Sequence, residues 1–161
     1  KFDQWLMGNN EALTADELHG YELFKANNCA TCHVGANLGG ESYELMGLRQ
    51  HYFEARGTEL TEEDNGRYKQ TKEERDRHRF KVPGLRNIEL TWPYYHDGTR
   101  ATMEEAVRDM ALYQCDVELT DAEVASIVAF MRTLTGEYQG KKLTSDNEYG
   151  VVLNAENHTH E

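Results

Sequence analysis

The sequence predicts an all-α fold, on three observations. Three segments begin with an S/T-x-x-E capping box, in which a hydroxyl accepts the N–H three residues on and the Glu reaches back. After each box, apolar residues recur at helical spacing. No pair of segments alternates polar and apolar residues as two paired strands would. The 161 residues, 39% of them hydrophobic, suffice for one domain with a core, which excludes a disordered tail and a repeat array.

Two helices are expected near the N-terminus. A short helix covers Phe2 to Leu6 and is ended by Gly8 and the two asparagines after it. A longer helix, ADELHGYELFKANN, follows the capping box from Thr14 to Glu17, and Gly20 permits another backbone to approach it closely. Its apolar face consists of Leu18, Tyr21 and Phe24.

The segment between Gly39 and Phe80 lacks a clear period. Its stretch TEEDNGRYKQTKEERDRHRF is crowded with charged and turn-forming residues and has no sustained apolar stripe. We therefore expect a long surface excursion with a single helical turn.

Two more helices are expected after residue 100. The capping box from Thr102 to Glu105 opens MEEAVRDMALYQ, and the box from Thr120 to Glu123 opens AEVASIVAFMRTL. Gly136 supplies a C-terminal stop for the second helix. The apolar positions at helical spacing are Ala106, Val107, Met110 and Tyr113 in the first helix, and Val124, Ile127, Val128 and Met131 in the second.

The expected organisation is one domain over residues 1–140, followed by a C-terminal extension over 141–161 that wraps it. The chain begins at Lys1 without an apolar leader, so an export signal has been removed or lies upstream in a longer precursor. The longest apolar stretches are far too short to cross a bilayer.

The charge of the chain argues against polyanionic partners. Seventeen Lys and Arg against 29 Asp and Glu give a net charge of −12, which repels nucleic acid and anionic membranes. Two Arg and eight acidic residues give residues 101–140 alone a charge of −6. This stretch either steers a basic protein partner or is an ordinary solvated surface.

The sequence Cys29-Ala30-Thr31-Cys32-His33 is a C-x-x-C-H motif, a pattern typical of covalent c-type haem attachment. Two thiols three positions apart can each form a thioether to one of the two vinyl groups on the same porphyrin edge. His33 is then placed to ligate the iron from the proximal side.

Other interpretations of the motif explain less. A zinc site needs two more ligands at regular spacing, and a thioredoxin-like pair follows a strand rather than a helix. A plain disulfide leaves His33 unexplained. The third cysteine, Cys115, is either a small buried hydrophobe or a thiol that stays free or forms an intermolecular disulfide.

The second axial ligand is sought among the methionines. Met131 lies on the core face of the last helix, whereas Met110 follows Val107 by three positions, so its thioether can point inward toward a ring. A helical methionine is more often a core residue than a ligand, so spacing alone leaves the choice open. The five candidates are Met7, Met46, Met103, Met110 and Met131.

Four stretches, in order from about Phe2 to Gly136, resemble the carboxy-terminal haem domain of the bacterial di-haem cytochrome c peroxidases. Two strings within them, F-K-V-P-G-L-R-N and T-W-P-Y-Y-H-D-G, are much more diagnostic than C-x-x-C-H alone. The stretches are LTADELHGYELFKANNCATCHVGANLGG, DNGRYKQTKEERDRHRFKVPGLRNIELTWPYYHDG, ATMEEAVRDMALYQ and LTDAEVASIVAFMRTLTG.

The resemblance implies a cytochrome-c-like domain with long irregular loops, whose first and last helices cross at Gly20. It makes Cys29 and Cys32 the attachment residues, and His33 and Met110 the axial ligands of a high-potential haem that receives electrons. Relatives that oxidise a protein substrate carry a tyrosine at the distal position. Met110 therefore favours the peroxidase branch, although Tyr113 lies only one turn on.

The resemblance also implies a calcium ion between two haem domains, held in part by the backbone carbonyls of Thr91 and Pro93. Three cations lie beside or within the first diagnostic string and are either donors to the haem propionates or ordinary surface charges. They are Arg79, Lys81 and Arg86.

The function expected from the resemblance is electron transfer. A small donor protein of cytochrome c or cupredoxin type reduces this haem, which passes electrons to a peroxide-reducing haem in an amino-terminal partner domain. Because the chain has a single C-x-x-C-H motif, that second haem lies elsewhere in a longer protein or in a separate chain. The complete protein is expected to be a periplasmic homodimer. The alternative is a free-standing mono-haem electron carrier, which needs neither the excursion nor the T-W-P-Y-Y-H-D-G string.

Overall fold

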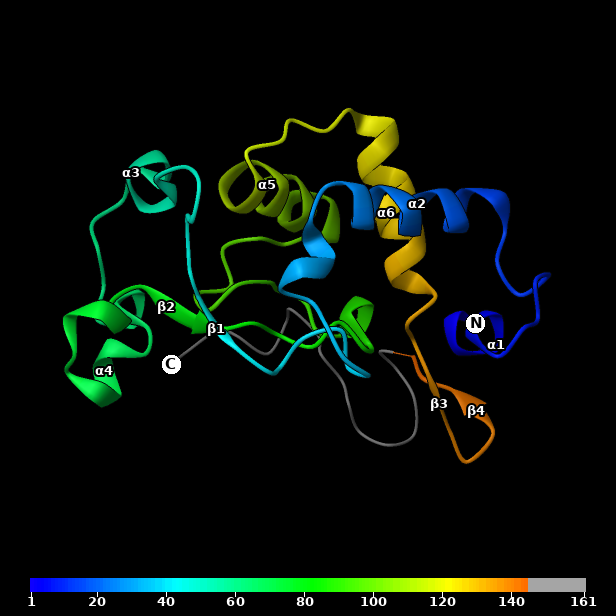
Figure 1. Ribbon diagram of the computed structural model, residues 1–161. Helices are drawn as coiled ribbons and strands as arrows, with labels where there is room; N and C mark the ends of the chain where they lie inside the picture. The colour runs from blue at the N-terminus through cyan, green and yellow to red at the C-terminus, as the bar shows by residue number, and fades with distance from the viewer. Residues whose placement is uncertain (145–161) are drawn as a thin grey trace.

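The computed structural model describes residues 1–144, so the extension expected over residues 141–161 lies outside the described residues beyond its first four. The fold is mostly helical, as predicted, and α2, α5 and α6 form its centre (Figure 1). Within the described range, no helix is both long and apolar enough to cross a membrane. The helices are α1 Phe2–Leu6, α2 Ala15–Ala26, α3 Tyr52–Arg56, α4 Tyr68–Thr71, α5 Met103–Cys115 and α6 Asp121–Arg132, with 3-10 turns η1 Cys29–Thr31, η2 Glu63–Asn65, η3 Glu74–Asp76 and η4 Ile88–Leu90.

All three predicted capping boxes are present, at Thr14, Thr102 and Thr120, and each begins one of the long helices. The end of α6 differs from the prediction, because the helix stops at Arg132 rather than continuing to Gly136. The Thr133 hydroxyl donates a 2.6 Å hydrogen bond to the carbonyl of Phe130. This local bond competes with the helical pattern, and the chain tightens into i→i−3 hydrogen bonds.

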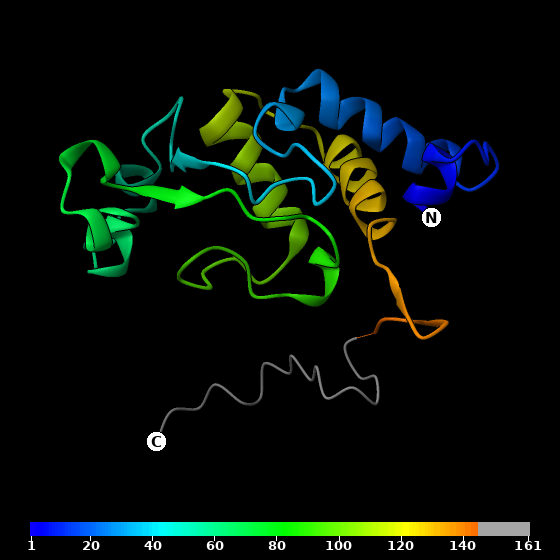
Figure 2. The same ribbon diagram turned by 60° about the horizontal axis from the view of Figure 1, so that its bottom comes forward.

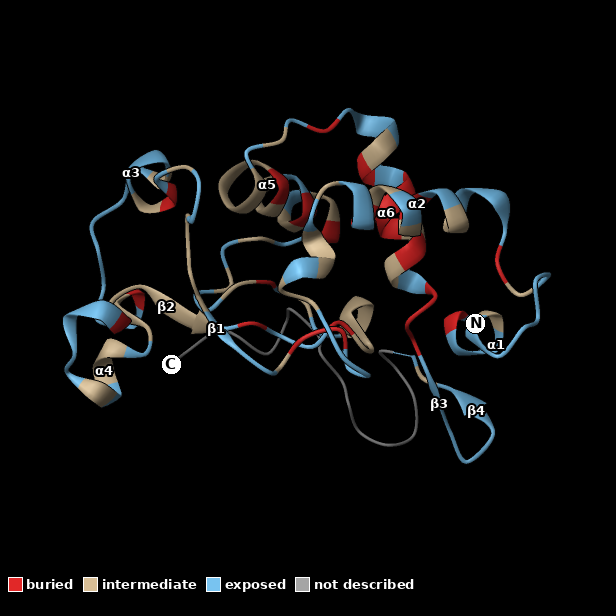
Figure 3. Cartoon of the chain, in the orientation of Figure 1, coloured by how far each residue is buried: buried red, intermediate tan, exposed pale blue. Residues whose placement is uncertain are grey.

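Helices α2 and α6 lie side by side, in contact at Gly20 (Figure 2). A Cβ atom built on Gly20 would lie only 1.8 Å from the carbonyl oxygen of Ser126, so the backbones meet without room for any side chain. Phe24 and the fully buried Phe130 pack beside this point, with ring centroids 5.5 Å apart. Buried residues are concentrated along α6 (Figure 3), which makes it the central helix of the core.

The segment from Gly39 to Phe80 is more ordered than a surface excursion with one helical turn, so that expectation was wrong. Strands β1 Tyr43–Leu45 and β2 Arg79–Lys81 pair antiparallel at its two ends, and α3, η2, α4 and η3 lie between them. A second small sheet joins β3 Glu137–Tyr138 to β4 Lys141–Lys142. Each strand has only two or three residues, too few for period-2 alternation to be seen in the sequence.

A buried ion pair holds this excursion together. The side chains of Arg56 and Asp64 are 8% and 1% exposed and form a two-pronged pair at 2.8 and 2.6 Å. His96 Nε2 lies 2.8 Å from the same carboxylate, and Asp97 accepts a 3.0 Å hydrogen bond from Arg56. His96 also stacks on Phe80 at 4.3 Å. The cluster therefore joins the excursion to the H-D of the T-W-P-Y-Y-H-D-G string.

We expect Gly20→Ala to destabilise the haem-loaded protein by about 2 kcal/mol, because the added methyl group forces α2 away from α6. Helix propensity alone predicts the opposite sign, a gain of about 1 kcal/mol. Denaturant unfolding measures the difference. His19→Ala, an exposed change in the same helix, serves as the control and should alter stability by less than about 0.5 kcal/mol.

Asp64 should make the free energy of unfolding depend on pH in the acidic range. The Arg56 guanidinium holds the pKa of this carboxyl well below its usual range, so its contribution is present above about pH 4 and is lost as the pH falls. Asp64→Asn should cost about 3 kcal/mol at neutral pH and flatten the stability profile in acid. Glu74→Gln breaks an exposed pair with Arg77 and should cost less than about 1 kcal/mol. Equal effects of the two variants in urea titrations would contradict this account.

Candidate functional site

The C-x-x-C-H motif directly follows α2. Asn28 takes a left-handed conformation, φ 64°, and turns the chain from the end of α2 into η1, which carries Cys29. Cys29 and Cys32 are both half-buried free thiols, so neither is engaged in a disulfide. Cys29 also packs against the core. Two free thiols beside the core are what attachment of a covalent porphyrin requires.

His33 is oriented by two backbone carbonyls. Its Nδ1 atom lies 3.1 Å from the carbonyl oxygen of Leu38 and 3.2 Å from that of Pro83. These oxygens can only accept, so Nδ1 carries the proton and Nε2 is left with its lone pair for a metal. Burial lowers the pKa of His33, although both carbonyls oppose the shift. The imidazole is thereby held in the neutral form, which is the one that ligates iron.

Sequence reasoning missed these two carbonyls, because the residues that bring Pro83 to His33 meet only in the fold. Gly39 has φ 133°, and a Cβ atom built there would come within 2.0 Å of the Pro83 carbonyl oxygen. The amide of Gly40 donates to Val82 at 2.7 Å, and that of Leu85 donates to Asn37 at 2.9 Å. One function of the V-P-G-L part of the F-K-V-P-G-L-R-N string is therefore to bring Pro83 against His33.

The methionines divide into two groups. Met7 is 80% exposed, Met103 is 6% exposed within the core, and Met131 packs against the core. Met46 and Met110 are half-buried and lie outside the core cluster. On α5 the buried residues are Met103, Val107 and Ala111, and Met110, seven residues after Met103, continues the same face where it is only half-buried. Burial thus reduces the candidates for the distal ligand to two.

Cys115 is a free thiol in the structure, as one of the two alternatives expected. It is half-buried at the end of α5, and its thiol interacts with that of Cys29. The interaction raises the pKa of Cys29 and lowers that of Cys115. Cys115 therefore lies at the attachment site, as a neighbour of one of the two thiols of the motif.

Two of the three basic candidates for propionate contacts have other partners. Arg79 forms a 2.9 Å ion pair with Glu44. Arg86 forms a two-pronged pair with Asp3 of α1 and also donates to the carbonyl of Ala36. Lys81 is exposed on β2. A contact between these residues and propionates stays a prediction.

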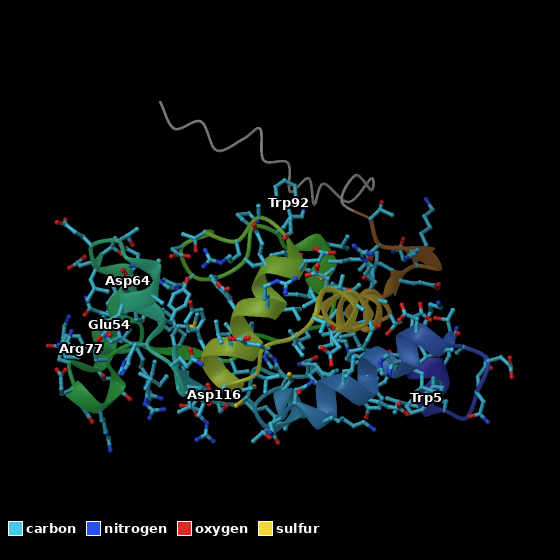
Figure 4. All side chains as sticks on the ribbon, turned by 90° about the horizontal axis from the view of Figure 1, so that it is seen from above. Trp5, Glu54, Asp64, Arg77, Trp92 and Asp116 are labelled. Carbon is cyan, nitrogen blue, oxygen red and sulfur yellow. The ribbon has the colours of Figure 1, made fainter. Side chains whose placement is uncertain are left out.

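Thr91 and Pro93, the candidate calcium ligands, flank Trp92 in the loop after η4. A hollow of about 290 Å³ adjoins this loop, and its lining includes the carboxylates of Glu89 and Glu104. Figure 4 shows Trp92 on the opposite edge of the molecule from Asp116, which caps the end of α5. The calcium assignment also stays a prediction.

Comparisons with known proteins show the family of this chain. The cytochrome c family model matches residues 18–135. The chain is 49% identical over 143 residues to a cytochrome c551 peroxidase of Nitrosomonas europaea, covering 89% of this chain and 41% of that protein. It is 50% identical over 137 residues to the cytochrome c peroxidase Ccp of Escherichia coli, covering 85% of this chain and 29% of that protein.

Solved structures show the same fold. The crystal structure of a MauG-like protein associated with microbial copper homeostasis matches with a TM-score of 0.67 and 27% identity, covering 84% of this chain and 51% of that chain. The chain thus spans less than half the length of the two peroxidases it matches.

Proposed function

Because this chain belongs to the cytochrome c family, we propose that it is the electron-transfer haem domain of a di-haem cytochrome c peroxidase. It receives electrons from a small donor protein of cytochrome c or cupredoxin type and passes them to a peroxide-reducing haem in an amino-terminal partner domain. There, hydrogen peroxide takes up two electrons and two protons and becomes two molecules of water. The observation that carries the proposal is that two backbone carbonyls orient the His33 ring and leave its Nε2 atom available to a metal. The chain that carries this histidine is about half identical to two proteins named as peroxidases.

The residues of the site fit a covalent haem. Cys29 and Cys32 would hold it through thioethers, and Nε2 of His33 and the sulfur of Met110 would ligate its iron. The haem supplies reversible one-electron redox chemistry, and soft thioether ligation in a partly apolar site favours the ferrous state. With both axial positions held by the protein, peroxide has no place to bind here, so this domain transfers electrons and does not reduce peroxide itself.

The complete protein has features that this chain supplies only in part. The carbonyls of Thr91 and Pro93 are neutral donors, suited to calcium only when a second domain completes the coordination shell. Bacterial haem c is attached outside the cytoplasmic membrane, so the protein is periplasmic. The assembled di-haem enzyme is a homodimer. A free-standing carrier is less well supported, because it needs no excursion pinned by a buried Arg56–Asp64 pair.

The distal ligand can be identified by comparing Met110→Leu with Met46→Leu. Ferric haem with His and Met ligands has a weak sulfur-to-iron absorption band at the red end of the visible spectrum. Met110→Leu should abolish this band and Met46→Leu should keep it. Both variants should retain covalent pigment on a denaturing gel, since Cys29 and Cys32 are unchanged. Loss of the band in Met46→Leu alone would reassign the ligand.

Peroxide reduction should require both domains. The ferrous haem-loaded chain should be oxidised by hydrogen peroxide only slowly, because no axial position is open. Adding the amino-terminal haem domain with calcium should make oxidation rapid, and chelation should slow it again. Stopped-flow absorbance of this haem follows both reactions. Fast peroxide turnover by this chain alone, unaffected by Met110→Leu, would show that the domain has a different function.

A further inference from the structure

The end of α5 is clasped by the segment 45–50 of the excursion, and Gln114 makes the central contacts. Its Oε1 atom accepts hydrogen bonds from the amides of Gly47 at 2.6 Å and Leu48 at 3.0 Å. Its Nε2 atom donates to the carbonyl of Leu45 at 2.9 Å. One half-buried amide thus joins α5 to backbone groups that are 66 to 69 residues away in the sequence.

Backbone contacts reinforce the clasp. The carbonyl oxygen of Tyr113 accepts from the amides of Arg49 at 2.9 Å and Gln50 at 3.2 Å. Carbonyls in the last turn of a helix have no partner within the helix, so segment 45–50 acts as its cap. The ring of Tyr52, 1% exposed, packs edge-on against Tyr113 at 5.3 Å. The end of α5 is therefore fixed in position and in rotation about its axis.

This fixed end carries the proposed distal ligand. Met110 and Gln114 are four residues apart, so they share one face of α5, and the buried residues Met103 and Val107, seven residues before each of them, lie on that same face. Core packing holds the N-terminal part of this face, and the Gln114 hydrogen bonds hold its C-terminal end, one turn beyond Met110. A rotation of α5 that moved Met110 would break the three Gln114 hydrogen bonds.

The clasp itself is anchored to rigid structure. Leu45 pairs with Arg79 across β1 and β2, and the amide of Met46 donates to the carbonyl of His78 at 2.9 Å. The His78 ring in turn lies 2.6 Å from the carbonyl of Asp64. Segment 45–50 is thereby tied to the buried ion pair of the excursion.

We propose that Gln114 is a positioning residue that holds Met110 at the distal side of the haem, an inference that rests on the proposed function. Thioether sulfur is a weak iron ligand compared with imidazole, so its occupancy depends on how firmly the protein presents it. Residues that orient a ligand from behind commonly change metal affinity by about 10- to 100-fold when altered. The excursion then has a function in the haem site, because it supplies the fixed end against which α5 is held.

The test uses the haem-loaded chain and imidazole, which competes with methionine for the ferric iron. Gln114→Leu removes all three hydrogen bonds and should tighten imidazole binding about 10-fold and weaken the sulfur-to-iron band. Gln114→Glu keeps an acceptor for Gly47 and Leu48 but loses the donor to Leu45, so its effect should be smaller. Gln70→Leu, at an exposed glutamine of α4, is the matched control and should change neither quantity.

The outcomes separate this inference from the proposed function. Unchanged imidazole affinity and an unchanged band in Gln114→Leu would overturn the positioning role, provided that Met110→Leu abolishes the band. If Met110→Leu leaves the band intact, the ligand assignment itself is wrong and this inference fails with it. Should Gln114→Leu lose its helical circular dichroism, Gln114→Glu decides, because it must then show the tighter imidazole binding in a folded chain.

Discussion

The close backbone contact between α2 and α6 at Gly20 determines how the two parts of the haem site meet. The C-terminal end of α2 leads directly into Cys29. The residues after α6 lead to Leu134, whose carbonyl accepts a 3.2 Å hydrogen bond from the amide of Asn87 and so fixes the segment that follows Pro83. One helix thus delivers His33 and the other fixes the segment that carries the carbonyl orienting it. A side chain at residue 20 would push α2 away from α6 and so move His33 away from the carbonyl of Pro83 that orients it.

The distal side depends on a different kind of constraint. Arg56 is buried with two carboxylates around it, and such a pair is costly to desolvate, so by itself it is weak evidence of stabilisation. Its structural effect is to constrain the excursion, since removing either partner would leave a buried charge unpaired. His96 and Asp97 belong to this arrangement, so the H-D of the T-W-P-Y-Y-H-D-G string contributes to the order of the excursion.

What could be predicted from the sequence was local. The capping boxes at Thr14, Thr102 and Thr120 and the C-x-x-C-H motif are set by residues within five positions of one another, and all were found. The bonds of His33 to Pro83 and of Gln114 to Gly47 join residues 50 and 67 positions apart, where no spacing rule applies. The end of α6 was missed because the hydroxyl of Thr133 competes for a backbone carbonyl, a choice that propensity does not decide.

The two proposed axial ligands therefore differ in how the chain secures them. His33 is held by Leu38, five residues on, and needs only one distant partner, whereas the end of α5 near Met110 is held by contacts that span about half of the domain. Long-range contacts form only after the loops between them have closed, so the proximal side can be ordered before the distal side. Under the proposed assignment, changes in the excursion should act on Met110 and leave His33 in place. A haem arranged in this way can have its potential adjusted from a surface segment without losing its covalent and proximal attachment.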